Sequence, residues 1–200
     1  MTHPVHVGLV GMGTVGTGVV RVLQDSADHI ASQAGREIIV NHVVVQDPKK
    51  PRSVELPSEQ LSNELHRIAD NPSISVVAVL LGGIEPARTI CLELLRRGKD
   101  LVTANKALLA EHGPELFQAA REAGRSIAFE AAIGGGIPIV AAVSECLTGN
   151  RIASIRGILN GTSNFILTKM EQEGSAYKDV LALAQSEGYA EADPTMDVDG

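Results

Sequence analysis

Three glycines near the start of the chain have the spacing of a phosphate-binding turn. The motif reads Gly11-Met12-Gly13-Thr14-Val15-Gly16. It follows an apolar run at residues 5–10 and opens a segment whose apolar residues have helical spacing. In such a turn the first glycine permits a tight bend, the second lets the backbone approach a pyrophosphate, and the third lets the helix pack on the strand. Because a helix N-terminus also offers unpaired N–H groups to phosphates, residues 11–16 predict dinucleotide binding.

The segment after the second apolar run bears on which dinucleotide is bound. Asp47 could accept hydrogen bonds from a free ribose 2′-hydroxyl, which favours NAD. Lys49, Lys50 or Arg52 could instead neutralise a 2′-phosphate, which favours NADP. A solvated loop that touches neither group is the alternative. The sequence therefore leaves the preference between NAD and NADP open.

A lysine follows the fourth apolar run, in the sequence Val102-Thr103-Ala104-Asn105-Lys106. Ligands gather outside the carboxyl ends of the strands in open α/β sheets, so this position is suited to chemistry. The ammonium of Lys106 can donate a proton or a hydrogen bond to a carbonyl oxygen that gains charge as hydride arrives. In the reverse reaction the same group would act as a base. The alternative is a surface lysine that begins a helix.

The elements that must position these residues follow from the hydrophobic pattern. In the first 130 residues, apolar runs rich in β-branched residues alternate with amphipathic segments, which is typical of a parallel sheet covered by helices. The expected strands are residues 5–10, 38–45, 76–81, 101–103 and 127–129. The expected helices are residues 15–33, 86–97 and 114–123. The pattern predicts an α/β fold, a Rossmann-type doubly wound parallel sheet, over residues 1–131.

From residue 131 the composition changes, with three successive glycines and a proline that suit a domain junction. Beyond it we expect a helix at 137–147, a strand at 152–159, a helix opened by Thr162 and Ser163, and a helix at 175–187. Residues 132–200 are therefore predicted to be part of a second α+β domain for substrate binding and dimerisation. The polar segment at the end predicts that the chain is cut from a larger protein.

Composition and charge exclude several function classes. The net charge of −7, from 17 basic and 24 acidic residues, opposes binding to nucleic acid. The chain has neither an apolar run long enough to span a membrane nor a secretory signal, so we expect a cytoplasmic protein without membrane contact. The two cysteines, Cys91 and Cys146, are interpreted as small hydrophobic residues.

The sequence resembles the homoserine dehydrogenase family in five blocks spread over the whole chain. They are GLVGMGTVG at 8–16, VTANK at 102–106, EAAIGGGIPI at 130–139, GILNGTSNFIL at 157–167 and EGYAEADPTMDVDG at 187–200. The resemblance implies an NAD(P)-dependent oxidoreductase that interconverts L-homoserine and L-aspartate 4-semialdehyde in threonine and methionine biosynthesis. It also implies a small amino-acid substrate and a homodimer for the full-length protein.

The resemblance further assigns residues to the substrate and the cofactor. Glu191 matches the family's substrate-binding glutamate, and Tyr189 lies beside the substrate pocket. Gly188 matches a glycine that contacts the cofactor. The loop that reaches the substrate is matched by Asn160, Gly161 and Thr162.

A monovalent cation, usually sodium, is also implied by the resemblance, at Glu130, Ile133, Gly135 and Ile137. Hard cations prefer oxygen ligands, so only main-chain carbonyls would be needed at the two isoleucines. The alternative is a tight turn that joins two domains.

Two other functions stay open at this point. A non-catalytic dinucleotide sensor would use the same glycine motif but would need neither Lys106 nor Glu191. An aldehyde dehydrogenase that acylates Cys146 would require an activated thiolate.

For a homoserine dehydrogenase, the resemblance implies an aspartate and a catalytic lysine that fall a few positions beyond Gly200. A chain that ended there is therefore expected to bind cofactor but to turn over poorly.

Overall fold

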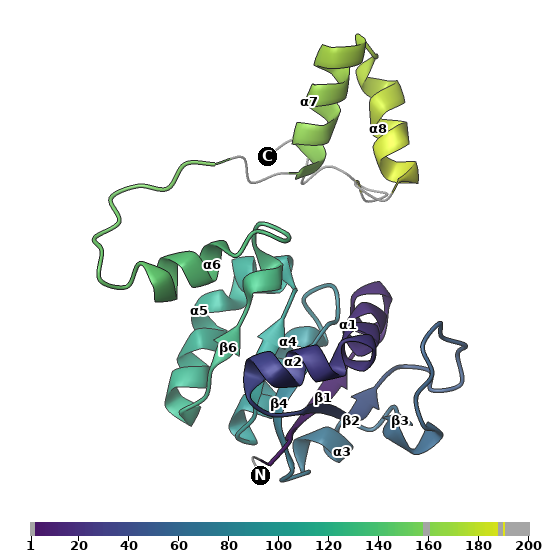
Figure 1. Cartoon of the computed structure of the whole chain (residues 1–200), viewed down its shortest axis with the longest axis vertical. Coiled ribbons are helices and arrows are strands. Elements are labelled where there is room, and N and C mark those ends of the chain that lie inside the picture. Colours follow the sequence, from purple (N-terminus) through teal and green to yellow (C-terminus); the bar gives the residue numbers. More distant parts are fainter. Residues whose placement is uncertain (1–2, 158–160, 188–189, 191–200) are drawn as a thin grey trace. The chain divides into compact units, whose positions relative to one another are not determined.

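The computed structural model describes residues 3–157, 161–187 and 190 (Figure 1). The chain divides into two compact units, Met1–Val143 and Ser144–Gly200. The first unit holds a parallel six-stranded sheet in the order β3-β2-β1-β4-β5-β6. Its strands are β1 (Val5–Val10), β2 (Ile38–Val44), β3 (Leu61–Ser62), β4 (Ile74–Val79), β5 (Asp100–Thr103) and β6 (Ile127–Ala128). The order reverses beside β1, and this confirms the Rossmann-type doubly wound sheet.

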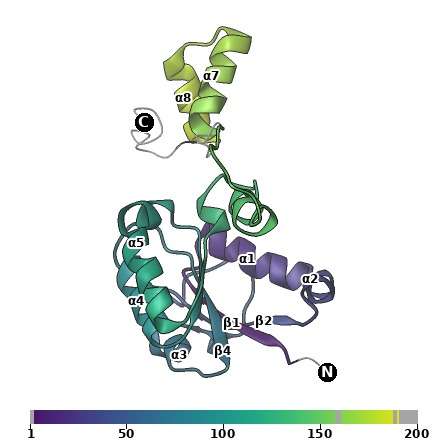
Figure 2. The same ribbon diagram turned by 90° about the vertical axis from the view of Figure 1, so that its left-hand side faces the viewer.

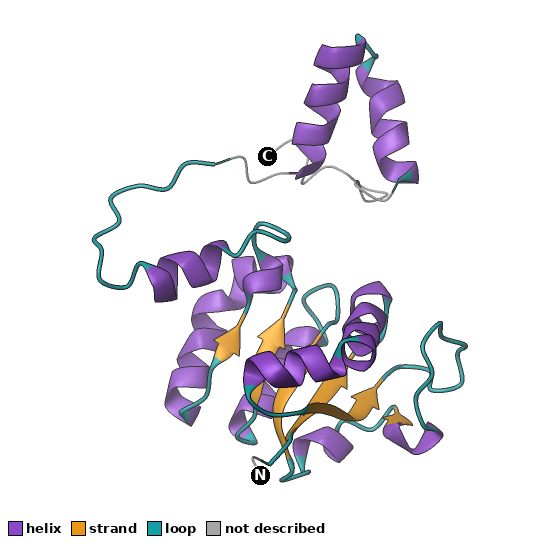
Figure 3. Ribbon diagram, in the orientation of Figure 1, coloured by secondary structure: helices purple, strands orange, loops and turns teal. Residues whose placement is uncertain are grey.

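Helices cover both faces of this sheet (Figures 2 and 3). One face carries α1 (Thr14–Asp25) and α2 (Ala27–Ala34), and the other carries α4 (Ala87–Arg96) and α5 (Lys106–Ala123). The short helices α3 (His66–Ala69) and α6 (Ile139–Ala141) and the 3₁₀ turns η1 (Ser58–Gln60) and η2 (Glu130–Ala132) also belong to this unit. No helix within residues 3–157 and 161–187 has the length and apolar character needed to cross a membrane.

The core lies in two layers, one on each face of the sheet. Leu9 and Val43 pack with Val20 of α1, whereas the next residue along each strand, Val10 and Val44, packs in the layer beneath α4 and α5. Successive side chains of a strand point to opposite faces, so a nearly continuous apolar run supplies both layers. The central strands are therefore buried on both sides and can fix the loops that follow them.

Two expected helices have different bounds in the structure. The helix predicted at 15–33 is split, because Ser26 leaves the helical region (φ −117°, ψ 23°) and ends α1 before α2 begins. The helix predicted from residue 114 begins at Lys106 and contains Pro114. Proline is common in the first turn of a helix, which is why the sequence pattern places the helix start at Pro114. In the structure the helix already begins after the N-cap at Asn105.

The second unit contains α7 (Gly161–Glu173) and α8 (Tyr177–Ser186), which pack through Ile166, Val180 and Ala184. The strand predicted at 152–159 is absent from its described part, which ends at residue 157. A strand needs a neighbour for its backbone groups, and residues 144–157, 161–187 and 190 include no other strand. The helix predicted at 137–147 becomes a short α6 (Ile139–Ala141) followed by the π-helical turn η3 (Ala142–Cys146).

Candidate functional site

The glycine turn, residues 11–16, connects β1 to α1, and two of its glycines are required by the fold. Gly11 has φ +96°, and a Cβ there would lie 2.8 Å from the carbonyl oxygen of Leu80. A Cβ at Gly16 would overlap the carbonyl oxygen of Gly11. Both positions therefore keep the turn tight and let α1 lie close to the sheet.

The middle glycine is open to solvent instead. A Cβ at Gly13 would meet no atom within 4 Å. Gly13 is the N-cap of α1, where no side chain accepts a hydrogen bond from the first turn and no acidic residue lies in that turn. The N–H groups and the positive end of the helix dipole are thus available to an anion. This geometry suits a pyrophosphate.

A pocket of about 660 Å³ lies beside the glycine turn. It is lined by Met12 to Thr14, by Thr17, Gly18 and Arg21 of α1, and by residues 50–53 of the loop after β2. Arg21, Lys50 and Arg52 bring three positive charges to its wall. A pocket with this lining is suited to a phosphorylated ligand.

The loop after β2 is held together by Arg52. Its guanidinium donates hydrogen bonds to the carbonyl oxygens of Asp47 (2.8 Å), Pro48 (3.4 Å) and Lys50 (2.7 Å). The Asp47 carboxylate accepts a hydrogen bond from the Lys49 N–H at 2.9 Å, so it serves the loop, and Asp47 does not line the pocket.

Lys106 lies on the same edge of the sheet as the glycine turn, because both follow the carboxyl ends of parallel strands. It is the first residue of α5 and is exposed. Its ammonium makes no hydrogen bond or ion pair within the part of the chain that the structure describes. The group is therefore available to a ligand at the edge where ligands bind.

Glu130 follows β6 on this edge and holds the start of α6. Its two carboxylate oxygens accept hydrogen bonds from the backbone N–H groups of Val140 (2.9 Å) and Ala141 (2.8 Å). The carbonyl oxygen of Ile137 accepts from the Ile139 N–H at 2.8 Å.

For the implied cation, the donor set offers oxygens of the right kind. The carbonyls of Ile133 and Gly135 accept no hydrogen bond from any residue in the described ranges, and each Glu130 oxygen keeps a second lone pair. These residues can therefore fit a hard monovalent ion, with Glu130 also acting as a cap.

The expected substrate residues fall in the second unit. Gly161 is the first residue of α7, and Thr162 is buried at 8% exposure. Asn160, Gly188, Tyr189 and Glu191 lie outside the described residues.

Comparison with known families assigns both parts of the chain. Residues 11–130 match the model of the homoserine dehydrogenase NAD binding domain, and residues 138–200 match the model of homoserine dehydrogenase. The chain belongs to the homoserine dehydrogenase family. The resemblance found in the five sequence blocks is thereby confirmed.

Relatives support this over almost the whole chain. It is 49% identical to a homoserine dehydrogenase of Synechocystis sp. and 47% identical to that of Bacillus subtilis, with 98% of this chain and 45% of each relative covered. The crystal structure of a homoserine dehydrogenase from Thiobacillus denitrificans superposes with a TM-score of 0.87 at 46% identity, over 98% of this chain and 45% of that one. A hyperthermophilic archaeal homoserine dehydrogenase in complex with NADPH gives a TM-score of 0.79 at 25% identity, over 99% of this chain and 66% of that one.

The chain thus spans about 45% of the length of the first relatives it matches. These relatives are dehydrogenases, and nothing in the comparison supports the non-catalytic redox sensor.

The sequence reasoning missed Arg21 and Asn105. Arg21 lies on the same face of α1 as Thr14, Thr17 and Gly18. The spacing of three and four residues could have shown that all four line one side of the helix. Asn105 was noted only as a neighbour of Lys106, since the two hydrogen bonds that its Nδ2 atom donates go to residues more than twenty positions away.

Proposed function

We propose that this chain is the cofactor-binding and N-terminal catalytic part of a homoserine dehydrogenase that interconverts L-homoserine and L-aspartate 4-semialdehyde with NAD(P). The observation that carries the proposal is the pairing of two features on one sheet edge. A helix N-terminus open to phosphate at Gly13 lies on the same edge as the free ammonium of Lys106, in a chain of this family.

The backbone of residues 11–16 would hold the pyrophosphate of a nicotinamide dinucleotide, which would supply the hydride that reduces the aldehyde carbon. Lys106 donates a hydrogen bond and then a proton to the aldehyde oxygen, so the carbonyl becomes a primary alcohol. In the oxidative direction Lys106 accepts the proton of the homoserine hydroxyl. Charge stabilisation of this kind is most effective where water is excluded around the reacting oxygen.

Within this proposal the cofactor is NADP. Arg21 and Lys50 line the pocket beside the glycine turn, together with Arg52, whose guanidinium also holds its own loop. The Asp47 carboxylate is engaged by that loop and does not line the pocket. The relative solved in complex with NADPH points in the same direction. A double variant with Arg21→Gln and Lys50→Gln is expected to weaken NADPH binding at least about tenfold, since each charge-assisted hydrogen bond is worth about 1.5–3 kcal/mol. NADH binding should change little. Equal losses for both cofactors would contradict the assignment.

The substrate would be held by residues of the second domain, which we propose begins at residue 132. Glu191 would accept hydrogen bonds from the substrate ammonium, with Asn160, Gly161, Thr162 and Tyr189 around the substrate and Gly188 beside the cofactor. The same domain would form the homodimer of the full-length protein.

A sodium ion bound by Glu130 and by the carbonyls of Ile133, Gly135 and Ile137 completes the proposal. Replacing sodium chloride with choline chloride at equal ionic strength should then lower the thermal stability. A variant with Glu130→Gln should lose that difference.

The test uses the complete gene product that contains these 200 residues. Oxidation of NADPH and NADH is followed with L-aspartate 4-semialdehyde as substrate, for wild type and for Lys106→Met. General-acid catalysis contributes about 100-fold or more, so kcat should fall by at least that factor. Lys178→Met, on the exposed side of α8, is the matched control and should retain activity. A Lys106→Met enzyme with near-wild-type kcat would overturn the role of Lys106, and a wild type that binds NADPH without turnover would overturn the proposed reaction.

A further inference from the structure

Asn105 connects three separate segments through one side chain. It lies between β5 and α5 and is 8% exposed. Its Oδ1 atom accepts a hydrogen bond from the Leu108 N–H at 3.0 Å, which caps α5. Its Nδ2 atom donates to the carbonyl oxygens of Leu81 (3.0 Å) and Gly83 (2.5 Å) in the loop after β4. The side-chain amide thus uses its oxygen and both of its N–H groups.

The same loop, residues 80–86, also contacts the glycine turn. The Leu80 N–H donates to the carbonyl oxygen of Val10 at 2.8 Å. A Cβ placed on Gly11 would meet the Leu80 carbonyl oxygen at 2.8 Å and the Leu81 side chain at 2.9 Å. The loop is therefore packed against the phosphate-binding turn on one side and held by Asn105 on the other.

The backbone of Asn105 is held as well. Its N–H donates to Thr103 Oγ1 at 3.2 Å, and the Thr103 hydroxyl donates to the carbonyl oxygen of Val79 at 3.1 Å. Thr103 is 2% exposed. The ends of β4 and β5 and the first turn of α5 are thereby connected by buried hydrogen bonds.

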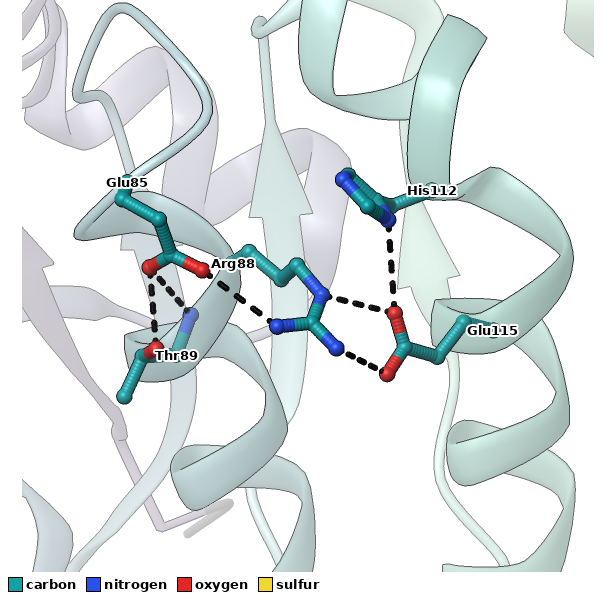
Figure 4. A network of polar contacts seen from close by, with 5 residues as sticks. All are labelled: Glu85, Arg88, Thr89, His112 and Glu115. Carbon is teal, nitrogen blue, oxygen red and sulfur yellow. Dashed lines mark hydrogen bonds and ion pairs between the residues drawn. The ribbon is translucent and has the colours of Figure 1, made fainter.

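A second group of contacts holds the far end of the loop to α5 (Figure 4). Arg88 donates to Glu115 at 2.7 and 2.5 Å and reaches Glu85 at 3.3 Å. Glu85 also accepts from the Thr89 hydroxyl at 2.9 Å, and His112 lies 3.5 Å from Glu115. These groups are partly exposed, and ion pairs in contact with water contribute little. The buried amide of Asn105 is thus the stronger constraint close to the sheet edge.

We propose that Asn105 is a positioning residue, which couples the phosphate-binding turn to Lys106 through the 80–86 loop. Asn105 is buried, and its side-chain amide is used by Leu81, Gly83 and Leu108. It fixes the first turn of α5, and hence the backbone of Lys106, relative to the loop that packs on Gly11. The inference rests on the proposed function, because it concerns turnover through Lys106.

Asparagine suits this position better than its closest substitutes. Aspartate would keep the oxygen that caps α5 but would place a carboxylate against two carbonyl oxygens. Serine would also keep a cap but would lose both N–H donors. Asn105→Ser therefore releases the loop while leaving the helix start in place, which separates positioning from folding.

The experiment compares wild type, Asn105→Ser and Asn105→Asp in the complete gene product. The matched control is Asn71→Ser, because Asn71 also donates through its amide to another segment, at Asn41 (3.3 Å), but precedes β4 at the opposite sheet edge. For each protein we would measure kcat and KM for aspartate semialdehyde, the Kd for NADPH from its fluorescence, and the thermal midpoint.

Both Asn105 variants should lose about 10- to 100-fold in kcat, because small misplacements of a catalytic group have effects of this size. Their NADPH Kd should change by less than about threefold, since residues 11–16, which we propose hold the pyrophosphate, are unchanged in both variants. Asn71→Ser should retain kcat even if its thermal midpoint falls. An active wild type together with an Asn105→Ser variant of unchanged kcat would overturn this inference alone. A wild type without turnover would overturn the proposed function, and the positioning role with it.

Discussion

The second and third glycines of the phosphate-binding turn, Gly13 and Gly16, should respond in opposite ways to one added methyl group. In Gly13→Ala the new Cβ meets no protein atom within 4 Å, so the fold can accept it. The remaining cost is the poorer N-cap, about 1 kcal/mol. In Gly16→Ala the Cβ overlaps the Gly11 carbonyl oxygen, so the backbone must shift. Overpacking of this kind costs about 3 kcal/mol, which corresponds to about 6–12 °C in thermal midpoint for a chain of this size.

For cofactor binding the order should be the reverse, so that Gly13→Ala weakens NADPH binding more than Gly16→Ala does. The methyl of Gly13→Ala occupies the space through which a phosphate approaches the N–H groups of α1. Losing one such hydrogen bond, at about 1.5–3 kcal/mol, raises the NADPH Kd by about 10- to 100-fold. Enhancement of NADPH fluorescence gives the Kd, and differential scanning fluorimetry gives the thermal midpoint.

Gly149→Ala is the matched control, because its Cβ would also meet no atom within 4 Å and the residue lies in the other unit. It should change neither quantity. A stably folded Gly13→Ala variant that binds NADPH as tightly as wild type would refute the assignment of this helix N-terminus to the pyrophosphate.

Three further predictions concern stability and reactivity. Burial raises the pKa of the Cys91 thiol to about 12, whereas Cys146 is exposed. Of these two residues, a thiol reagent should therefore modify Cys146 and spare Cys91 in the native complete gene product, without loss of turnover. Turnover lost on modification of Cys146 would favour the acylating mechanism. The hydrogen bonds from Arg88 hold the pKa of Glu115 below its usual range. The stabilisation from these hydrogen bonds is present above the unfolded pKa of about 4.3 and is lost as pH falls through the lower folded pKa. The difference in thermal midpoint between wild type and Glu115→Gln should therefore shrink in acid. A difference that is independent of pH would contradict this. Lys99 is 4% exposed, and its ammonium donates hydrogen bonds to two backbone carbonyls. Lys99→Met should therefore lower the free energy of unfolding, measured in urea, by about 1.5–3 kcal/mol. An unchanged free energy of unfolding would show that these carbonyls need no partner.

Several features of the fold could be predicted because their causes are local. The apolar runs at 5–10, 38–45 and 101–103 correspond closely to strands, since β-branched residues in continuous runs suit a sheet buried on both faces. The spacing of the three glycines also predicts that Gly11 permits a tight turn and that Gly16 lets the helix pack on the strand. The structure confirms that both positions are too crowded for a Cβ atom.

Other features could not be predicted because they depend on partners distant in the sequence. The two-residue strand β3 carries no pattern of its own and exists by pairing with β2. The strand expected at 152–159 had the right composition but has no neighbouring strand within the described part of its unit. Likewise, the role of Glu130 as a cap for α6 depends on a bend in the intervening residues.

The amino-acid sequence by itself determined the class of fold, the family and the chemical groups that could act, because these follow from periodicity and from motifs of a few adjacent residues. The tertiary structure alone decided what each polar group is free to do. Asp47 and Arg52 hold their own loop, Asn105 ties a loop to a helix, and Lys106 is left with an exposed ammonium. The physical reason is that a side chain's availability depends on the carbonyls and N–H groups that folding brings within hydrogen-bond distance, and those come from elsewhere in the chain.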